Sequence, residues 1–152
     1  MSYYNRKSPR ISNYDYSNPN YFFITICAHH RKCLFGTVSE LNPIGKIVRD
    51  HIIQIPGHYQ HIRIDKYVVM PNHIHLILCL PAGGNNDARQ VIGQFKSGVT
   101  RAIRAHFPNM QVWQRSFHDH VIRNDEDYRR IWNYIDGNPL CWEKDCFFVD
   151  HN

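Results

Sequence analysis

Apolar residues follow two kinds of spacing along this chain, and together they predict a regular order of strands and helices. Four segments rich in β-branched and aromatic residues indicate strands, at residues 21–28, 61–70 and 72–80 and within 112–123. Three segments have helical spacing. The first begins at Asn42-Pro43 and stops at Pro56-Gly57, the second runs from 88 to 107, and the third runs from Asn124 to Gly137-Asn138-Pro139. The predicted order is strand, helix, strand, strand, helix, strand, and one further helix.

This order indicates the fold class. A βαββαβ unit folds most economically as a four-stranded antiparallel sheet with two helices on one face. We therefore predict an α+β, ferredoxin-like βαββαβ sheet with an additional C-terminal helix that carries Tyr134. If the two helices cover the face that carries Ile74 and Leu76, then His73 and His75 point to the other face, and the additional helix is free to lie across it.

The two histidines alternate with apolar residues in one predicted strand. Strand geometry places His73 and His75 on the same side. They are either a hydrogen-bonded pair on a half-exposed strand or two neutral imidazoles that share one divalent metal. Cys79 lies on the same strand face, so a zinc site is a further alternative. On the last helix, Tyr134 and Asn138 are four residues apart and therefore one turn apart.

Composition favours one basic domain. The 152 residues predict a single domain at 21–152 after a polar, basic N-terminal arm at 1–20. Eighteen Lys and Arg against thirteen Asp and Glu give a net charge of +5, which favours a polyanionic partner. No segment resembles a signal peptide or a membrane span, so we expect no membrane association. Five cysteines without C-x-x-C spacing indicate free thiols, and we expect a cytoplasmic protein.

Three motifs resemble those of a known family. The run Tyr67–Leu76 contains Met-Pro-Asn-His-Ile-His, the run Trp113–Arg123 contains Trp-Gln-Arg-Ser-Phe-His-Asp-His, and Tyr134–Pro139 reads Tyr-Ile-Asp-Gly-Asn-Pro. Together, and in this order, they resemble the REP-associated tyrosine transposases, which belong to the HUH-type single-strand transposases and endonucleases. The resemblance extends from about Tyr21 to Trp142.

The resemblance implies a role for each of four residues. His73 and His75 match the two metal-binding histidines of the family, and Tyr134 matches its nucleophile. Asn138 matches the polar residue that completes the metal site, where related transposases have a Gln. The implied activity is metal-dependent cleavage and rejoining of single-stranded DNA through a 5′-phosphotyrosine intermediate, at repetitive palindromic elements. The implied partner is single-stranded or hairpin DNA, bound by a monomer or homodimer.

Physical chemistry agrees with these roles. The negative charge of a phosphodiester repels nucleophiles, and a divalent cation acts as a Lewis acid that offsets this charge. Two imidazoles and one amide form an open, neutral site that suits Mg²⁺ or Mn²⁺. A tyrosine phenol has an ordinary pKa near ~10, so a neighbouring group must favour its ionised form. Because protonated imidazoles cannot bind a metal, we expect activity to fall below about pH 6.

Basic side chains are the expected contacts to DNA phosphates, and two other functions stay open. One alternative is a non-catalytic single-stranded nucleic-acid-binding module on the same fold. The other is a metal-dependent hydrolase in which water attacks and Tyr134 has no role. The residues that we expect to contact DNA are Arg6, Arg10, Lys96, Arg101, Arg104 and Arg115.

Overall fold

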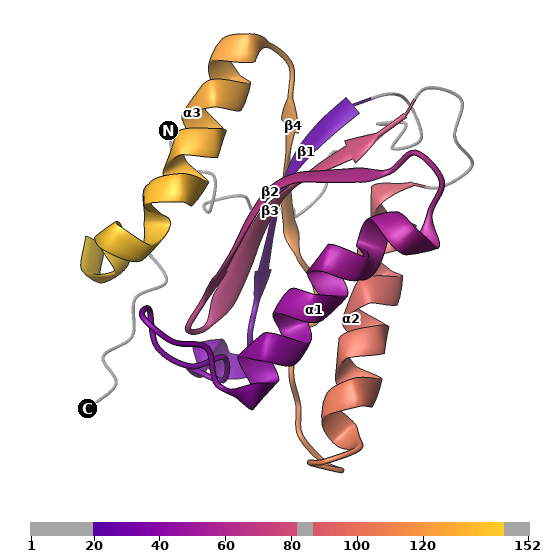
Figure 1. The fold of residues 1–152 in the computed structure, drawn as a ribbon, viewed down its shortest axis with the longest axis vertical. Helices are drawn as coiled ribbons and strands as arrows, with labels where there is room; N and C mark the ends of the chain where they lie inside the picture. The colour runs from indigo at the N-terminus through magenta and orange to yellow at the C-terminus, as the bar shows by residue number, and fades with distance from the viewer. Residues whose placement is uncertain (1–19, 82–86, 145–152) are drawn as a thin grey trace.

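The chain forms a sheet between two helical layers (Figure 1). The structure is a computed structural model that describes residues 20–81 and 87–144, with the backbone alone at 143 and 144. Two short 3₁₀ helices, η1 (His29–Arg31) and η2 (Asn138–Lys144), accompany the main elements. The main elements are β1 (Asn20–Cys27), α1 (Pro43–His58), β2 (Arg63–Met70), β3 (His73–Leu80), α2 (Ala88–Arg104), β4 (His118–Ile122) and α3 (Asp125–Gly137).

The sheet has the predicted topology. Its strands lie in the order β2-β3-β1-β4, and every neighbouring pair is antiparallel. This confirms the α+β fold class with its additional C-terminal helix. In the register of the central strands, Thr25 of β1 lies opposite His75 of β3 on one side and opposite His118 of β4 on the other. These three side chains therefore share one face of the sheet.

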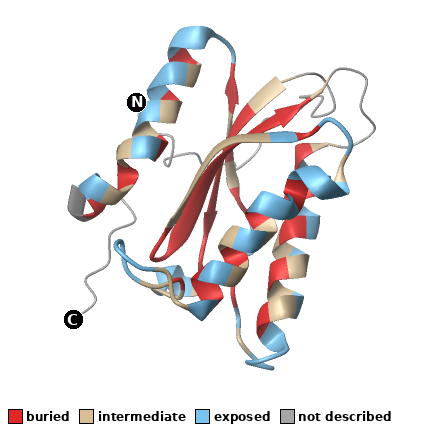
Figure 2. Ribbon diagram, in the orientation of Figure 1, coloured by how far each residue is buried: buried red, intermediate tan, exposed pale blue. Residues whose placement is uncertain are grey.

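The helices α1 and α2 cover the opposite face and form the larger core. Alternating side chains of β1 and β3, among them Ile24, Ile74 and Leu76, pack with the apolar stripes of these helices. Figure 2 shows this arrangement as buried stripes on the helix sides that face a buried sheet. Each helix begins at a side-chain cap, which satisfies a free backbone N–H group in its first turn. The caps are Asn42, Asp87 and Asn124, with hydrogen bonds of 2.7 to 2.8 Å.

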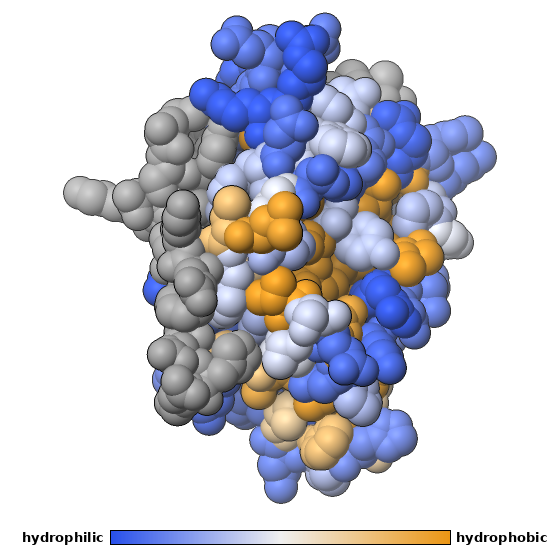
Figure 3. Space-filling view, turned by 60° about the vertical axis from the view of Figure 1, so that its left-hand side comes forward, coloured by the Kyte–Doolittle hydropathy of each residue, from blue (hydrophilic) through white to orange (hydrophobic). Residues whose placement is uncertain are grey.

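The helix α3 lies on the face that carries the histidines, as predicted. A second apolar cluster joins Phe23 and Ile77 of the sheet to Ile131 and Ile135 of α3. In Figure 3 the side of the molecule with α3 comes forward, and hydrophobic side chains gather in its middle with hydrophilic ones around them. Polar contacts also hold α3 to both edge strands. These pairs are Lys66–Asp136, Tyr128–Asp65 and His120–Asp127, with atoms 2.7, 2.8 and 2.6 Å apart.

Some predicted boundaries differ from the structure. The first helix continues through Pro56 to His58, because a proline near the C-terminal end of a helix removes only one backbone hydrogen bond. The second helix ends at Arg104, three residues before the predicted end. Of the segment 112–123, only residues 118–122 form a strand of the sheet. The strand β1 begins at Asn20, and the rest of the predicted arm lies outside the described residues.

The larger core predicts the effect of truncating a central side chain. Leu76 is fully buried between the sheet and the helices, so Leu76→Ala should lower the free energy of unfolding by about 2–5 kcal/mol, measured by urea denaturation. Ile53 on α1 is 55% exposed, and Ile53→Ala should change it by no more than about 0.5 kcal/mol. Equal losses in the two variants would contradict the assignment of this face to the core.

Candidate active site

Two buried imidazoles form the centre of the candidate site. The side chains of His73 and His75 are both 0% exposed, and their Nε2 atoms lie 3.1 Å apart. The two rings meet edge to face, with centroids 4.6 Å apart. Both histidines lie on the predicted face of the sheet, where α3 and η2 cover them. The pair is therefore not a surface pair.

Each imidazole has a hydrogen-bond partner that fixes its orientation. The Nδ1 of His73 lies 2.8 Å from Oδ1 of Asn72, which can only accept, so His73 donates through Nδ1 and its Nε2 carries a lone pair. His75 then donates from Nε2 to Nε2 of His73. The hydroxyl of Thr25 lies 2.9 Å from Nδ1 of His75 and donates to it. All three contacts are satisfied when both rings are neutral.

The tyrosine and the amide of the last motif reach the same place. The Tyr134 ring lies against that of His75, with centroids 5.5 Å apart, and against that of Phe23, at 6.2 Å. Asn138 is 2% exposed and keeps a helical backbone (φ −59°, ψ −43°) although a proline follows it. Its side chain therefore stays one turn beyond Tyr134 and contacts His73.

Burial sets the ionisation of the two histidines. The pKa of His73 is lowered to about 3, first by burial and then by the positive charge of Arg31, while a side-chain hydrogen bond with Asn138 acts to raise it. Burial, and next the neighbouring His73, lower the pKa of His75 well below its usual value. Both rings therefore stay neutral well below pH 6. The expected loss of activity below about pH 6 assumed an ordinary histidine pKa, and these shifts move protonation of the free site to lower pH.

The residues at this point fit a divalent cation. The two Nε2 atoms lie 3.1 Å apart, so His73 and His75 would be able to hold one ion between them, and imidazole nitrogen is a ligand that divalent metals accept. The Oδ1 atom of Asn138 is buried and has no hydrogen-bond partner among the described residues. Within residues 20–81 and 87–144, no three His, Cys, Asp or Glu side chains cluster as a metal site. The donor set is thus two imidazoles and an amide, and Cys79 lies instead beside Tyr21 and Arg63.

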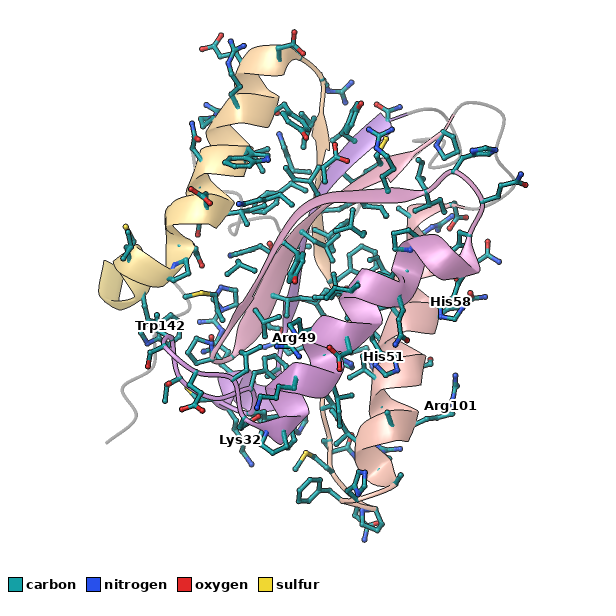
Figure 4. The ribbon with its side chains drawn as sticks, in the orientation of Figure 1. Lys32, Arg49, His51, His58, Arg101 and Trp142 are labelled. Atoms are coloured by element: carbon teal, nitrogen blue, oxygen red, sulfur yellow. The ribbon has the colours of Figure 1, made fainter. Side chains whose placement is uncertain are left out.

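The basic residues of α2 do not join this site. Lys96 and Arg101 lie on α2, on the opposite side of the sheet from α3, as Figure 4 shows for Arg101. The ammonium group of Lys96 donates to the carbonyl of Gln114 at 2.8 Å, and so holds the segment that leads to β4. Arg104 donates to the carbonyl of Met110 at 3.1 Å.

The remaining basic residues are placed as follows. Arg115 is exposed in the segment before β4. Arg6 and Arg10 lie outside the described residues. Of the expected DNA contacts, Lys96, Arg101 and Arg104 thus lie on the side of the sheet opposite the two histidines and Tyr134.

Four residues of the site were not predicted from the sequence. Thr25 and Asn72 orient the histidines, Arg31 places a positive charge near them, and Trp142 stacks beside His73 with ring centroids 6.1 Å apart. A polar residue within the apolar run of β1 was the one available signal for Thr25. Asn72 carried no such signal. Both roles follow from strand register and turn geometry, which periodicity does not specify.

An antiparallel sheet with paired histidines on a central strand, covered by a helix with a tyrosine and an asparagine one turn apart, defines the HUH-type tyrosine transposase class. The sequence profile of the family described as "Transposase IS200 like" matches residues 15–138. The chain therefore belongs to the IS200-like transposase family. Its members are enzymes of the DNA-cleaving transposase kind.

Similar proteins include REP-associated tyrosine transposases, as the motifs predicted. A REP-associated tyrosine transposase of Escherichia coli is 30% identical, over 79% of this chain and 66% of the relative. An uncharacterised protein of Haemophilus influenzae is 34% identical, over 97% of this chain and 95% of its own. A solved structure of a REP-associated tyrosine transposase bound to a REP hairpin has a TM-score of 0.66 and 28% identity, covering 86% of this chain and 73% of that one.

The lowered pKa of His73 predicts an acid dependence of stability. Between pH 6.5 and about pH 3 the unfolded chain binds a proton at His73 that the folded chain does not, so the free energy of unfolding falls on acidification. The contribution is up to about 1.4 kcal/mol per pH unit. In chelator, denaturant titrations from pH 6.5 to 4 should give a shallower pH dependence for His73→Gln than for the parent. Equal slopes would show that His73 titrates normally.

Proposed function

We propose that this protein cleaves and rejoins single-stranded DNA through a covalent link between Tyr134 and the 5′ phosphate. A divalent metal, Mg²⁺ or Mn²⁺, would be held by His73, His75 and Asn138. The observation that carries the proposal is the contact between the Tyr134 and His75 rings, whose centroids are 5.5 Å apart, beside two Nε2 atoms that lie 3.1 Å from each other. A nucleophile and a neutral metal-binding pair are thus adjacent in one chain, which supports the use of Tyr134 in cis.

The chemical step is a transesterification, so one phosphodiester bond replaces another. The phenolic oxygen of Tyr134 attacks phosphorus as its proton leaves, a bond from tyrosine to phosphorus forms, and the bond to the 3′ oxygen breaks and leaves a 3′-hydroxyl. Attack by a 3′-hydroxyl on the phosphotyrosine reverses these changes and rejoins a strand without nucleotide hydrolysis. When bound, the metal supplies Lewis-acid polarisation and neutralises phosphate charge. Packing of the Tyr134 ring against Phe23 and His75 holds the nucleophile in place.

Thr25 and Asn72 orient the two proposed metal ligands, His75 and His73, and set their tautomers. Metal binding needs a lone pair on Nε2 of both rings, and Asn72 already fixes this tautomer in His73. His75 must move its proton from Nε2 to Nδ1, where the Thr25 oxygen can accept it. A hydroxyl both donates and accepts, so Thr25 satisfies His75 before and after this change.

The proposed partner is a single-stranded or hairpin DNA with a repetitive palindrome. The support is the net charge of +5 and the likeness to a transposase whose structure holds a REP hairpin. The six basic residues named from the sequence would contact phosphates outside the cleavage site. The number of subunits, one or two, and the cytoplasmic location stay predictions. Within the described ranges no helix is long and apolar enough to cross a membrane.

The nucleophile is tested by removing one oxygen. Tyr134→Phe keeps the ring and its packing, so it should bind DNA like the parent but form no covalent adduct with labelled single-stranded DNA on a denaturing gel. Tyr128→Phe, in the same helix, loses only a hydrogen bond to Asp65 and should still form the adduct.

Other outcomes of this experiment select the alternatives. An adduct with Tyr134→Phe would identify another nucleophile. A parent that cuts but never links would be a hydrolase that uses water, and a parent that binds without cutting would be a binding module.

The metal site is tested through Thr25. Thr25→Val keeps the shape but removes the partner of His75, so the affinity for Mn²⁺ should fall about 10- to 100-fold by calorimetry, with a matching rise in the Mn²⁺ needed for cleavage. Thr100→Val is the matched control, because its hydroxyl bonds only within α2 on the other side of the sheet. If both variants bind Mn²⁺ like the parent, His75 is not a ligand oriented by Thr25.

A further inference from the structure

The segment 28–35 after β1, which contains the loop 29–32, is hydrogen-bonded to the turn before His73. The carbonyl of Arg31 accepts a hydrogen bond from the Asn72 side chain at 3.2 Å, and the backbone N–H of Ala28 donates to the Asn72 carbonyl at 2.9 Å. A third bond, 3.0 Å long, joins Phe35 to Pro71. The loop therefore lies at the end of the sheet where β3 begins, beside the candidate active site.

This loop carries positive charge toward that site. Arg31 is exposed, and its backbone carbonyl is hydrogen-bonded to Asn72, the residue directly before His73. The backbone holds an uncommon shape, with left-handed φ angles of 54° and 53° at His30 and Arg31. A Cβ atom at Gly45 of α1 would lie 2.1 Å from the carbonyl oxygen of Phe35, so α1 packs directly against the backbone at Phe35, just after the loop.

A hollow of about 570 Å³ adjoins the loop at His29 and Lys32. Its rim is basic and polar, and its wall is apolar. Phe107 in this wall is 45% exposed, which makes it an aromatic surface that a flat ring can stack on. Figure 4 shows Lys32 at the end of the molecule where the loop lies. The hollow is lined by His29, Lys32, Leu34, Phe107, Met110 and Gln111, among others.

We propose that the loop 29–32 and this hollow bind the unpaired strand next to the cleaved phosphate. Arg31 contacts a phosphate beside the active site, Lys32 contacts the next part of the backbone, and Phe107 stacks on a base. Positive charge along the backbone together with an exposed aromatic ring is the general means of binding single strands without a fixed sequence. The inference rests on the proposed function and names where its substrate lies.

A larger groove between α1 and α2 fits this role less well. It has a volume of about 890 Å³ and includes His51, His58 and Arg101, which Figure 4 shows on these two helices. The sheet separates it from Tyr134, so a strand in this groove has no direct path to the nucleophile. The loop and the hollow, in contrast, lie at the same end of the sheet as His73.

The test measures the binding of a labelled dT20 strand by fluorescence anisotropy in chelator. Arg31→Gln should weaken binding about fivefold near 0.1 M salt, and lower the slope of log K against log salt by about 0.7, as expected for the loss of one phosphate contact. Phe107→Ala should weaken binding at least fivefold with an unchanged slope. The loss for Phe107→Ala should vanish with an abasic strand of equal length and with blunt duplex.

Two residues of α1 provide matched controls. Arg49→Gln removes the same charge from a partly exposed side chain, and Ile53→Ala truncates an apolar side chain that is at least as accessible as Phe107; both variants should bind dT20 within twofold of the parent. Losses in the controls equal to those in Arg31→Gln and Phe107→Ala would overturn the subsite, as would an undiminished Phe107→Ala effect on the abasic strand. If the parent forms its adduct while Arg31→Gln and Phe107→Ala bind like the parent, the subsite is wrong and the proposed function stands.

Discussion

The site depends on two imidazoles that are buried and have to remain neutral. Removing a charged ring from water is costly, and burial therefore holds the pKa of both histidines far below the usual range. Their polar atoms still need partners, which Thr25, Asn72 and the contact between the two rings supply. The pair is thus neutral, oriented and shielded from water, with its two Nε2 atoms 3.1 Å apart.

The same burial positions the nucleophile. The sheet has two faces, and α1 and α2 fill only one of them, so α3 is needed to cover the apolar and imidazole side chains of the other. Its packing through Ile131 and Ile135 carries Tyr134 to His75. The helical backbone at Asn138 then continues into η2, which places Trp142 beside His73. Stability of this layer and geometry of the site are therefore coupled.

Much of this arrangement follows from patterns in the sequence. Period-two and helical spacing predicted the order of elements, the face on which His73 and His75 lie, and the helix that brings Tyr134 to them. Periodicity describes one element at a time, so it did not show that α3 and η2 bury the histidines, nor how this changes their pKa. Thr25 acquires its role only through the register of β1 against β3.

The basic residues show the other limit of sequence reasoning. Charge and helical position indicated Lys96, Arg101 and Arg104 as DNA contacts, yet their helix lies on the far side of the sheet. Lys96 and Arg104 also bond to backbone carbonyls of the segment before β4. Conversely, Arg31 is absent from the DNA contacts that were expected from the sequence. Its place beside His73 depends on hydrogen bonds between distant loops, which no local pattern reveals.

The central claim is that Tyr134, held against a neutral histidine pair, is the residue whose phenolic oxygen forms the covalent bond to DNA. Mass spectrometry of a trypsin-digested protein–DNA adduct tests this most directly. Cleavage after Arg130 and Lys144 releases a peptide of residues 131–144 in which Tyr134 is the one tyrosine. The account predicts that this peptide carries the nucleotide through a phosphodiester to tyrosine. A nucleotide attached to any other peptide, or a cleaved strand with no attached peptide, would contradict it.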